Sequence, residues 1–417
     1  MRIQPAKSIR GEIRVPPDKS ITHRMIFFAA MAKDRCEIEN PLISDDTLRT
    51  LDLVKSVGAN VGYDEGKLSI RMERISEPSS PIFCGNSGTT ARLGLGFLSR
   101  LPLFSVLYGD ASLSSRPMDR VIEPLSLLGP IFDGRNKASN LPVSVRGGKI
   151  KHANYRSKIA SAQVKSAFII AATAGDGIST YAEPVKSRDH TERFLNVFGI
   201  VSKKDGIIEI KPSVIPSFKA RVVGDFSSAA FFITLGVCHR NAILEIKDVG
   251  LNETRTGFLD VLKRMGASIE TRSIKNDFEP YGDLHVESSN LEGTEVSAEE
   301  IPSVIDEIPL IALLGAFAKG KTVVRGASEL RKKESDRIKA IVSVLSEMGA
   351  RVQEFEDGFS VEGCNLENAK IDPYGDHRIA MMAVIAGVCG NGVEITDPKV
   401  VSISYPSFFE DLKKVKR

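Results

Sequence analysis

The 417-residue sequence contains no tryptophan, six histidines and five cysteines, and the scarcity of the last two excludes several classes of site. The cysteines are odd in number and widely spaced, and no C-x-x-C pair is present, which argues against a disulfide framework and against a zinc knuckle. The histidines show no metal-ligand spacing, so we expect no metal. This cysteine usage is typical of a reducing compartment, and we expect a cytoplasmic protein.

Strong net charge and long apolar runs are also missing. Lys and Arg exceed Asp and Glu by 56 − 53 = 3, which is too balanced for a general nucleic-acid or membrane-surface binder. The longest apolar stretches, Ile308–Ala318 and Ile379–Gly387, are shorter than the ~20 residues of a membrane-spanning helix, and the N-terminus has no apolar segment of signal-peptide length. We therefore expect no nucleic-acid or membrane partner, and any anionic ligand must be bound by local clusters of positive charge.

What the sequence does contain is a repeat. A polar or glycine-bearing turn followed by a small-residue, apolar helix recurs six times, with equivalent positions 66 to 79 residues apart. These positions are Ser20, Ser87, Ser161, Ser227, Asp306 and Asp376. A second segment, an amphipathic helix that ends in glycine before a β-branched strand, alternates with the first. We therefore predict an α/β (α+β) fold in which the apolar helices are buried and the charged helices face solvent.

The length predicts two domains, because a single hydrophobic core usually stops growing near ~250–300 residues. Three repeats in each domain is the natural division, with a hinge near Gly224–Asp225. We assign the N-terminal strand Ile9–Val15 to the C-terminal half, so that the chain crosses twice between domains. The expected domains are residues 20–225, and residues 1–19 together with 226–417.

The starts of the apolar helices are candidate binding sites, because free N–H groups and the positive end of the helix dipole suit phosphate and carboxylate groups. Lys19 and Ser20 open the first helix, and Arg24 lies one turn on, on the same face. An N-cap serine with two solvated cations explains this motif equally well. Residues 85–92 (GNSGTTAR) resemble a phosphate-binding turn but lack the P-loop pattern, so a structural turn is the better interpretation of that segment alone.

Charged residues inside otherwise apolar elements are more informative. Asp306 precedes the helix of the fifth repeat, residues 331–337 (RKKESDR) follow it, and residues 376–378 (DHR) open the helix of the sixth. Each alone is explained by an N-cap or by a solvated helix face. Because arginines and carboxylates recur at the same place in several repeats, together they would form a cationic wall that contains a few acids. Such a wall suits a small polyanion and proton transfer.

These motifs together resemble the 5-enolpyruvylshikimate-3-phosphate (EPSP) synthase family of enolpyruvyl transferases. They span nearly the whole chain in the family's order: PPDKSITHR (16–24), GNSGTTAR (85–92), SRP (115–117), SAQ (161–163), SRDH (187–190), DEIP (306–309), ELRKKESDR (329–337), DHRIAM (376–381) and SYPSFFEDL (404–412). The resemblance implies two domains, each of three βαβαββ-type units, joined by two hinge strands. That architecture agrees with the repeat count.

The resemblance also implies an activity. In this family phosphoenolpyruvate is joined to the 5-hydroxyl of shikimate 3-phosphate and phosphate is released, on the route to chorismate and the aromatic amino acids. The implied contacts of shikimate 3-phosphate are Lys19, Ser20, Arg24, Ser161, Ala162, Gln163, Ser187, Asp306 and Lys333. The implied contacts of phosphoenolpyruvate are Lys19, Asn86, Gly88, Arg116, Gln163, Arg337 and Arg378. No cofactor is implied, we expect a monomer, and Gly88 leaves room beside phosphoenolpyruvate for the competitor glyphosate.

The implied catalytic residues are a base near the hydroxyl and an acid near the methylene carbon. Asp306 is the candidate base, and Glu334 and Lys19 are the candidate acids. A carboxylic acid stays protonated near neutral pH only where its surroundings raise its pKa, and neighbouring arginines oppose that. The choice between Glu334 and Lys19 therefore stays open.

Three positions depart from the family's usual pattern. Ala162 stands where many relatives have serine, Ile403 stands where many have lysine, and Glu329 stands where some have asparagine. Lys399 is the nearest candidate to replace the lysine contact that Ile403 does not provide.

Two other functions remain open at this point. The first is the sister transfer of enolpyruvyl to UDP-N-acetylglucosamine, but that family has Lys-Asn where this chain has Lys19 and Ser20, and residues 113–119 (LSSRPMD) lack its usual cysteine. The second is a non-catalytic repeat scaffold that binds anions. A scaffold does not require Asp306, Lys333 and Glu334 together.

Overall fold

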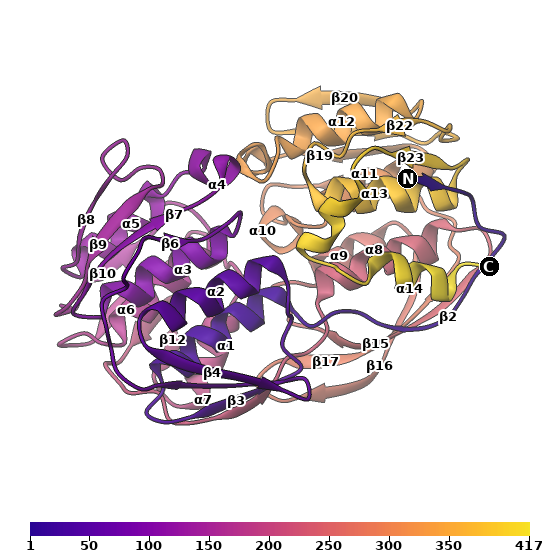
Figure 1. Ribbon diagram of the computed structural model, residues 1–417. Coiled ribbons are helices and arrows are strands. Elements are labelled where there is room, and N and C mark those ends of the chain that lie inside the picture. Colours follow the sequence, from indigo (N-terminus) through magenta and orange to yellow (C-terminus); the bar gives the residue numbers. More distant parts are fainter. The chain divides into compact units, whose positions relative to one another are not determined.

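The structure, a computed structural model, describes residues 1–417 and divides into two compact units (Figure 1). The N-terminal unit is Pro17–Val222, and the C-terminal unit is Met1–Pro16 with Val223–Arg417. The chain leaves one unit for the other after residues 16 and 222, where the sequence-based assignment placed the boundaries after 19 and 225. None of the helices combines the length and the apolar character that a membrane crossing requires.

Each unit contains three small sheets. Their strand orders are β14-β3-β5-β4, β6-β7-β9-β8 and β10-β11-β13-β12 in the N-terminal unit, and β16-β17-β15-β2, β18-β19-β21-β20 and β1-β23-β22 in the C-terminal unit. In chain order the strands are β1 (Arg2–Ile3), β2 (Ile9–Arg14), β3 (Cys36–Glu39), β4 (Ala59–Asp64), β5 (Lys67–Met72), β6 (Ile82–Phe83), β7 (Phe104–Tyr108), β8 (Ile131–Gly134), β9 (Val143–Arg146), β10 (Asn154–Arg156), β11 (Ser179–Ala182), β12 (Val201–Lys204), β13 (Ile207–Ile210), β14 (Lys219–Arg221), β15 (Ala242–Gly250), β16 (Ser268–Asn276), β17 (Pro280–Glu287), β18 (Glu295–Val296), β19 (Lys321–Val324), β20 (Arg351–Phe355), β21 (Gly358–Glu362), β22 (Lys370–Ile371) and β23 (Val393–Ile395).

The helices alternate with these strands in a fixed order. Six inner helices are α1 (Lys19–Met31), α3 (Gly88–Ser99), α6 (Ala162–Ala172), α8 (Phe226–Cys238), α11 (Ile308–Phe317) and α13 (His377–Cys389). Six amphipathic helices follow them one by one: α2 (Asp45–Ser56), α5 (Asp119–Leu127), α7 (His190–Val197), α9 (Gly257–Arg264), α12 (Arg337–Glu347) and α14 (Phe408–Val415). Short helices complete the chain: α4 (Ala111–Ser115), α10 (Ile301–Val304), η1 (Ser328–Lys332) and η2 (Pro398–Ile403).

One topological plan underlies the repeats. In the second repeat, β6 pairs in parallel with β7, β7 pairs antiparallel with β9, and β9 pairs antiparallel with β8. Helix α3 connects the parallel pair and α5 leads from β7 to β8, which gives the order β-α-β-α-β-β. The third and fifth repeats have the same pairing pattern. The predicted α/β repeat fold is therefore confirmed.

The first and fourth repeats exchange their first strands. Strand β2, which precedes α1 along the chain, pairs in parallel with β15 of the fourth repeat. Strand β14, which precedes α8, pairs in parallel with β3 of the first repeat. Each sheet still receives a complete set of strands, and the chain passes between the units twice as a consequence.

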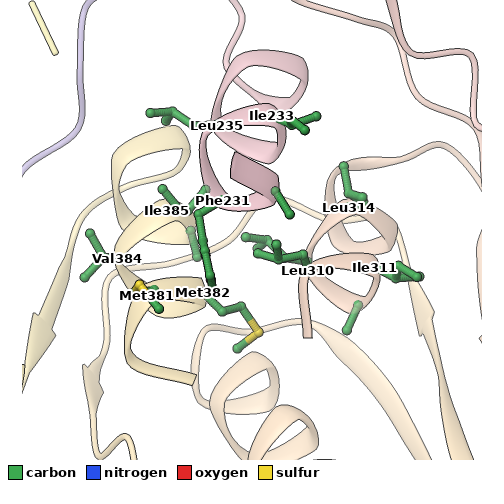
Figure 2. Close-up of a cluster of buried hydrophobic side chains, with 14 of the residues drawn as sticks. Phe231, Ile233, Leu235, Leu310, Ile311, Leu314, Met381, Met382, Val384 and Ile385 are labelled. Atoms are coloured by element: carbon green, nitrogen blue, oxygen red, sulfur yellow. The ribbon is translucent and has the colours of Figure 1, made fainter. Parts of the chain in front are cut away.

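The six inner helices are buried, as their apolar sequences predict. Figure 2 shows Phe231 of α8, Leu310 of α11 and Met382 of α13 within one cluster of buried side chains in the C-terminal unit. In the N-terminal unit, a Cβ on Gly96 of α3 would lie 2.3 Å from the carbonyl oxygen of Ala167 on α6. Only glycine allows the two helices to approach this closely, so small residues in these helices serve packing.

Candidate active site

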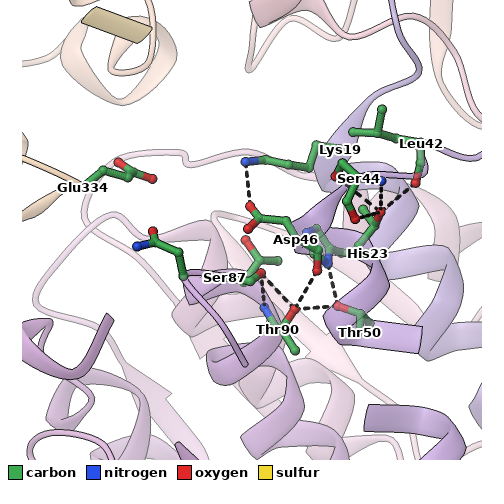
Figure 3. A network of polar contacts seen from close by, with 12 residues as sticks. Lys19, His23, Leu42, Ser44, Asp46, Thr50, Ser87, Thr90 and Glu334 are labelled. Atoms are coloured by element: carbon green, nitrogen blue, oxygen red, sulfur yellow. Dashed lines mark hydrogen bonds and ion pairs between the residues drawn. The ribbon is translucent and has the colours of Figure 1, made fainter. Parts of the chain in front are cut away.

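The entry to α1 holds Lys19 in an ion pair. Asp18 caps the helix by accepting a hydrogen bond from the N–H of Ile21 at 2.8 Å. Lys19 Nζ lies 2.9 Å from Oδ2 of Asp46, which belongs to the first turn of α2 (Figure 3). The alternative interpretation of this motif, an N-cap serine with solvated cations, is therefore wrong: Asp18 is the cap, and the Lys19 side chain is only 19% exposed.

A buried hydroxyl network lies below Lys19. Thr90 Oγ1 of α3 is within hydrogen-bond distance of Ser87 Oγ (2.8 Å), Thr50 Oγ1 (2.7 Å) and the carbonyl oxygen of Asp46 (3.2 Å). Thr50 in turn contacts His23 Nδ1 at 2.7 Å (Figure 3). Burial lowers the pKa of His23 to about 3, so this imidazole is neutral at physiological pH. The network fixes the first turns of α1, α2 and α3 relative to one another.

The start of α3 presents Asn86 and Gly88 beside two guanidinium groups. Asn86 accepts a hydrogen bond from Arg116 Nη2 and donates one to Asp110 at 2.7 Å. A Cβ on Gly88 would lie 3.1 Å from Arg92 Nη1 and 3.6 Å from Arg116 Nη1. Because Gly88 has no side chain, space stays open beside the N-terminus of α3 and the guanidinium groups of Arg92 and Arg116. Such a space suits an anion.

The start of α6 carries the SAQ motif. Ser161 caps the helix by accepting from the N–H of Val164 at 3.4 Å, and Ala162 is its first residue. Gln163 accepts a hydrogen bond from Arg92 at 2.6 Å and donates one to Thr89 Oγ1 at 2.9 Å. The two helix starts are therefore joined through Arg92, which the sequence reasoning did not select.

Two further candidates of the N-terminal unit are buried. Arg24 is 2% exposed and donates to Thr191 Oγ1, to the Ser20 carbonyl oxygen and to Ser166 Oγ, each at 2.9 Å. Ser187, in the loop after β11, is 5% exposed and donates its hydroxyl proton to Glu183 at 2.6 Å. Ser20 itself is half-buried in the first turn of α1.

In the C-terminal unit, Asp306 is surrounded by arginines. Its carboxylate oxygens lie 3.6 Å from Arg337 Nη1, 3.6 Å from Arg378 Nη2 and 4.0 Å from Arg255 Nη1. Arg378 also donates to the Asp306 carbonyl oxygen at 3.1 Å. Asp306 is not the N-cap of α11, a place that Glu307 occupies. The positive charges stabilise the ionised form of this carboxylate, which is the form that a base requires, although they also lower its affinity for a proton.

Arg337 links three carboxylates. Its Nε lies 2.7 Å from Asp376, its Nη2 lies 2.6 Å from Glu334, and its third nitrogen faces Asp306. Burial opposes the charge of Arg337, but Asp376, Glu334 and Asp306 outweigh it and raise the pKa of this guanidinium above its ordinary value. Residues 331–337 are therefore no solvated helix face. The short Glu334 contact favours an ionised Glu334.

The remaining positions are less enclosed. Lys333 is half-buried at the C-terminal end of η1, beside Glu334. Of the departures from the family pattern, Glu329 and Ile403 are half-buried, and Lys399 is exposed on η2. No group of three His, Cys, Asp or Glu residues is arranged to hold a metal ion.

Several residues of these clusters were not selected from the sequence. Arg255 lies in NETRTG, a segment read only as the start of an amphipathic helix. Asp46 and Glu183 likewise belong to no motif that was connected with a site. Only Arg92 had a local signal, because it is four residues beyond Gly88 on the same helix.

A comparison with family models decides the relationship. The model for EPSP synthase (3-phosphoshikimate 1-carboxyvinyltransferase) matches residues 3–412. The chain belongs to this family. A 3-phosphoshikimate 1-carboxyvinyltransferase of Thermotoga neapolitana is 45% identical over 419 aligned positions, which cover 100% of this chain and 99% of that protein. The enzyme of the same name from Aquifex aeolicus is 44% identical, with 99% of each chain covered.

Solved structures agree with the family assignment. An EPSP synthase from Acinetobacter baumannii is 35% identical with a TM-score of 0.88, over 100% of this chain and 98% of that one. The enolpyruvyl transferase NikO from Streptomyces tendae is 17% identical with a TM-score of 0.80, over 99% and 96% of the chains. At that identity the second likeness shows the fold alone. The predicted enolpyruvyl transferase fold is confirmed.

Proposed function

We propose that this chain is a 3-phosphoshikimate 1-carboxyvinyltransferase, which transfers the enolpyruvyl group of phosphoenolpyruvate to the 5-hydroxyl of shikimate 3-phosphate. The observation that carries this function is the family match over residues 3–412, together with relatives of that name that align over their full length. The product lies on the route to chorismate and the aromatic amino acids.

The substrates are assigned by charge and hydrogen-bonding capacity. Phosphoenolpyruvate takes the cations and amides at the start of α3 and on α12 and α13: Lys19, Asn86, Gly88, Arg116, Gln163, Arg337 and Arg378. Shikimate 3-phosphate is bound by Lys19 and Arg24 of α1 and by hydroxyl and amide groups at and near the start of α6. Asp306 and Lys333 contact the hydroxyls of its ring. The remaining assigned contacts are Ser20, Ser161, Ala162, Gln163 and Ser187. Helix starts and arginines are well suited to both anions.

The addition step needs a base and an acid. The oxygen of the 5-hydroxyl bonds to C2 of phosphoenolpyruvate while Asp306 accepts the hydroxyl proton. An acid delivers a proton to the methylene carbon C3. The result is a tetrahedral intermediate that still carries phosphate on C2. In the elimination step the conjugate base of that acid takes a proton back from C3, the C2–O bond breaks with release of phosphate, and the vinyl group forms again.

We assign the acid to Lys19 rather than to Glu334. Glu334 accepts a hydrogen bond from Arg337 at 2.6 Å, which stabilises the ionised carboxylate and leaves no proton to deliver. Lys19 is an ammonium group, paired with Asp46 at 2.9 Å, and carries transferable protons. In this assignment Glu334 holds Arg337 in place.

We also infer a monomer, and sedimentation at the mass of one chain tests this. The five cysteines form no disulfide, which supports a cytoplasmic protein. Competition between glyphosate and phosphoenolpyruvate belongs to the same proposal, because Gly88 leaves space in front of Arg92 and Arg116.

Product analysis tests the function. Incubation with both substrates is expected to give one new compound whose mass equals the sum of the substrates less phosphoric acid, with a vinyl ether signal in its NMR spectrum. The same analysis with UDP-N-acetylglucosamine as acceptor is expected to give no product. A product from the sugar nucleotide alone would contradict the proposal.

A further inference from the structure

A buried charge cluster lies behind the candidate phosphate contacts and has no part in the chemistry proposed above. Lys165 of α6 is fully buried, and its Nζ lies 2.7 Å from Glu183 Oε1 and 2.7 Å from Glu192 Oε1. The same Nζ donates to the carbonyl oxygen of Ser187 at 3.2 Å. Lys165 therefore connects the loop that carries Ser187 to α6, the helix that is capped by Ser161, another candidate contact of the phosphate.

Within this cluster Glu183 holds Ser187 by two bonds. The backbone N–H of Ser187 donates to Glu183 Oε1 at 2.9 Å, and the Ser187 hydroxyl donates to Glu183 Oε2 at 2.6 Å. An ionised carboxylate only accepts hydrogen bonds, and a serine hydroxyl has a single proton to give. The one proton that Ser187 could offer to a phosphate oxygen is therefore already directed at Glu183.

We propose that Glu183 is a positioning residue for the 3-phosphate, which fixes Ser187 through its backbone and holds its hydroxyl proton until a phosphate oxygen replaces the carboxylate as acceptor. This inference rests on the proposed function, because it takes Ser187 as a contact of the 3-phosphate. When the Ser187 hydroxyl donates its proton to the phosphate, Glu183 Oε2 loses its hydrogen-bond donor. Ser187 is only 5% exposed, so water does not readily replace that donor. A buried carboxylate is destabilised when it loses a hydrogen bond. This cost is subtracted from the free energy of phosphate binding, so Glu183 lowers the affinity for the phosphate.

The substitution Glu183→Gln isolates this effect. The amide oxygen can take the place of Oε1, because Lys165 and the Ser187 N–H both donate there. The amide NH2 then faces Ser187 Oγ and donates to it, which leaves the hydroxyl proton for the phosphate. We expect the dissociation constant of shikimate 3-phosphate, measured by calorimetry, to fall about three- to tenfold, the range of one hydrogen bond. The KM for phosphoenolpyruvate is expected to stay unchanged.

Glu192→Gln is the matched control. It removes the same charge from the same buried lysine, but Glu192 has no contact with Ser187. We expect no change in the affinity for shikimate 3-phosphate, whereas a general electrostatic effect would raise the affinity in both variants. Thermal unfolding of each variant verifies that it is folded before binding is measured.

Ser187→Ala completes the cycle. Alone it is expected to weaken binding of shikimate 3-phosphate, and in that background Glu183→Gln is expected to bring no gain. Unchanged or weaker binding by folded Glu183→Gln, an equal gain in Glu192→Gln, or a gain that survives Ser187→Ala would each overturn the proposal. If the wild-type protein binds no shikimate 3-phosphate while it uses another acceptor, the proposed function itself is wrong and the role of Glu183 falls with it.

Discussion

Arg337 Nε donates to Asp376 Oδ2 at 2.7 Å, and the two side chains are 1% and 0% exposed. Asp376 also caps α13 by accepting from the N–H of Arg378 at 2.9 Å. Burial raises the pKa of Asp376, but Arg337 and His377 together lower it by more, so the pKa of this carboxyl is below its ordinary value. One buried carboxylate thereby fixes the backbone of one candidate arginine and the side chain of another.

The first prediction concerns this carboxylate. Asp376→Asn keeps the size and the cap but removes the charge opposite Arg337, so the guanidinium loses its charged partner and its fixed orientation. We expect the KM for phosphoenolpyruvate to rise about tenfold or more, and the KM for shikimate 3-phosphate to change less. Steady-state kinetics with each substrate varied in turn measures both. Asp336→Asn is the control: it alters the cap of α12 and the ion pair with Arg331 but leaves Asp376 opposite Arg337, and we expect it to change the KM for phosphoenolpyruvate much less.

The second prediction tests the base. Asp306→Asn retains the shape of the side chain but cannot accept the hydroxyl proton, and we expect kcat to fall about 10²- to 10⁴-fold. Calorimetry should show that shikimate 3-phosphate still binds, because the other proposed contacts remain. Turnover near the wild-type rate would remove Asp306 from the mechanism.

The third prediction separates the two candidate acids. If Lys19 donates the proton, Lys19→Met loses about 10²-fold or more in kcat, whereas Glu334→Gln stays within about tenfold because its amide oxygen still accepts from Arg337. Rapid-quench measurement of single turnovers follows the addition step directly. The reverse ranking, with Glu334→Gln the slower variant, would assign the acid to Glu334.

The fourth prediction concerns pH and stability. A histidine side chain ordinarily has a pKa of 6.5, and burial lowers the pKa of His23 to about 3 in the fold. Between these two pH values the unfolded chain therefore binds a proton that the folded chain does not bind. Stability is therefore lost as the pH falls below 6.5, and by pH 5 the loss attributable to His23 is roughly 2 kcal/mol. Urea unfolding at pH 7 and pH 5 measures it.

The variant His23→Asn provides the comparison for that loss. It keeps a polar partner for Thr50 but does not titrate, so its stability is expected to change less between the two pH values than that of the wild type. The same pH dependence in both proteins would show that His23 is not the group responsible.

Much of the fold could be predicted because each repeat carries its own signals. The six apolar helices were recognisable from small and apolar residues alone, and they are the six buried helices of the structure. The pairing of β2 with β15 and of β14 with β3 is less accessible. The sequence placed residues 9–15 with the C-terminal half, but it did not identify β15 as the partner of β2 or β3 as the partner of β14, because strands about 200 residues apart share no periodic pattern.

The candidate residues show the same division. Asp306 and Arg378 stand out beside apolar helices and Arg337 ends the charged segment 331–337, and the structure brings the three together. Arg255 reaches Asp306 from a segment with no such contrast, and Glu183 acts through Ser187 from four residues away. Residues such as Arg255 and Glu183 are recognised only by the side chains that they contact in the fold, so composition and sequence spacing do not predict them.

The most direct test of the function is the release of phosphate from phosphoenolpyruvate by the purified protein. Parallel reactions would contain shikimate 3-phosphate, UDP-N-acetylglucosamine or neither acceptor. We predict release only with shikimate 3-phosphate. Release only with the sugar nucleotide, or no release with either acceptor from folded protein, would contradict the proposed function, and the second result would favour an anion-binding scaffold.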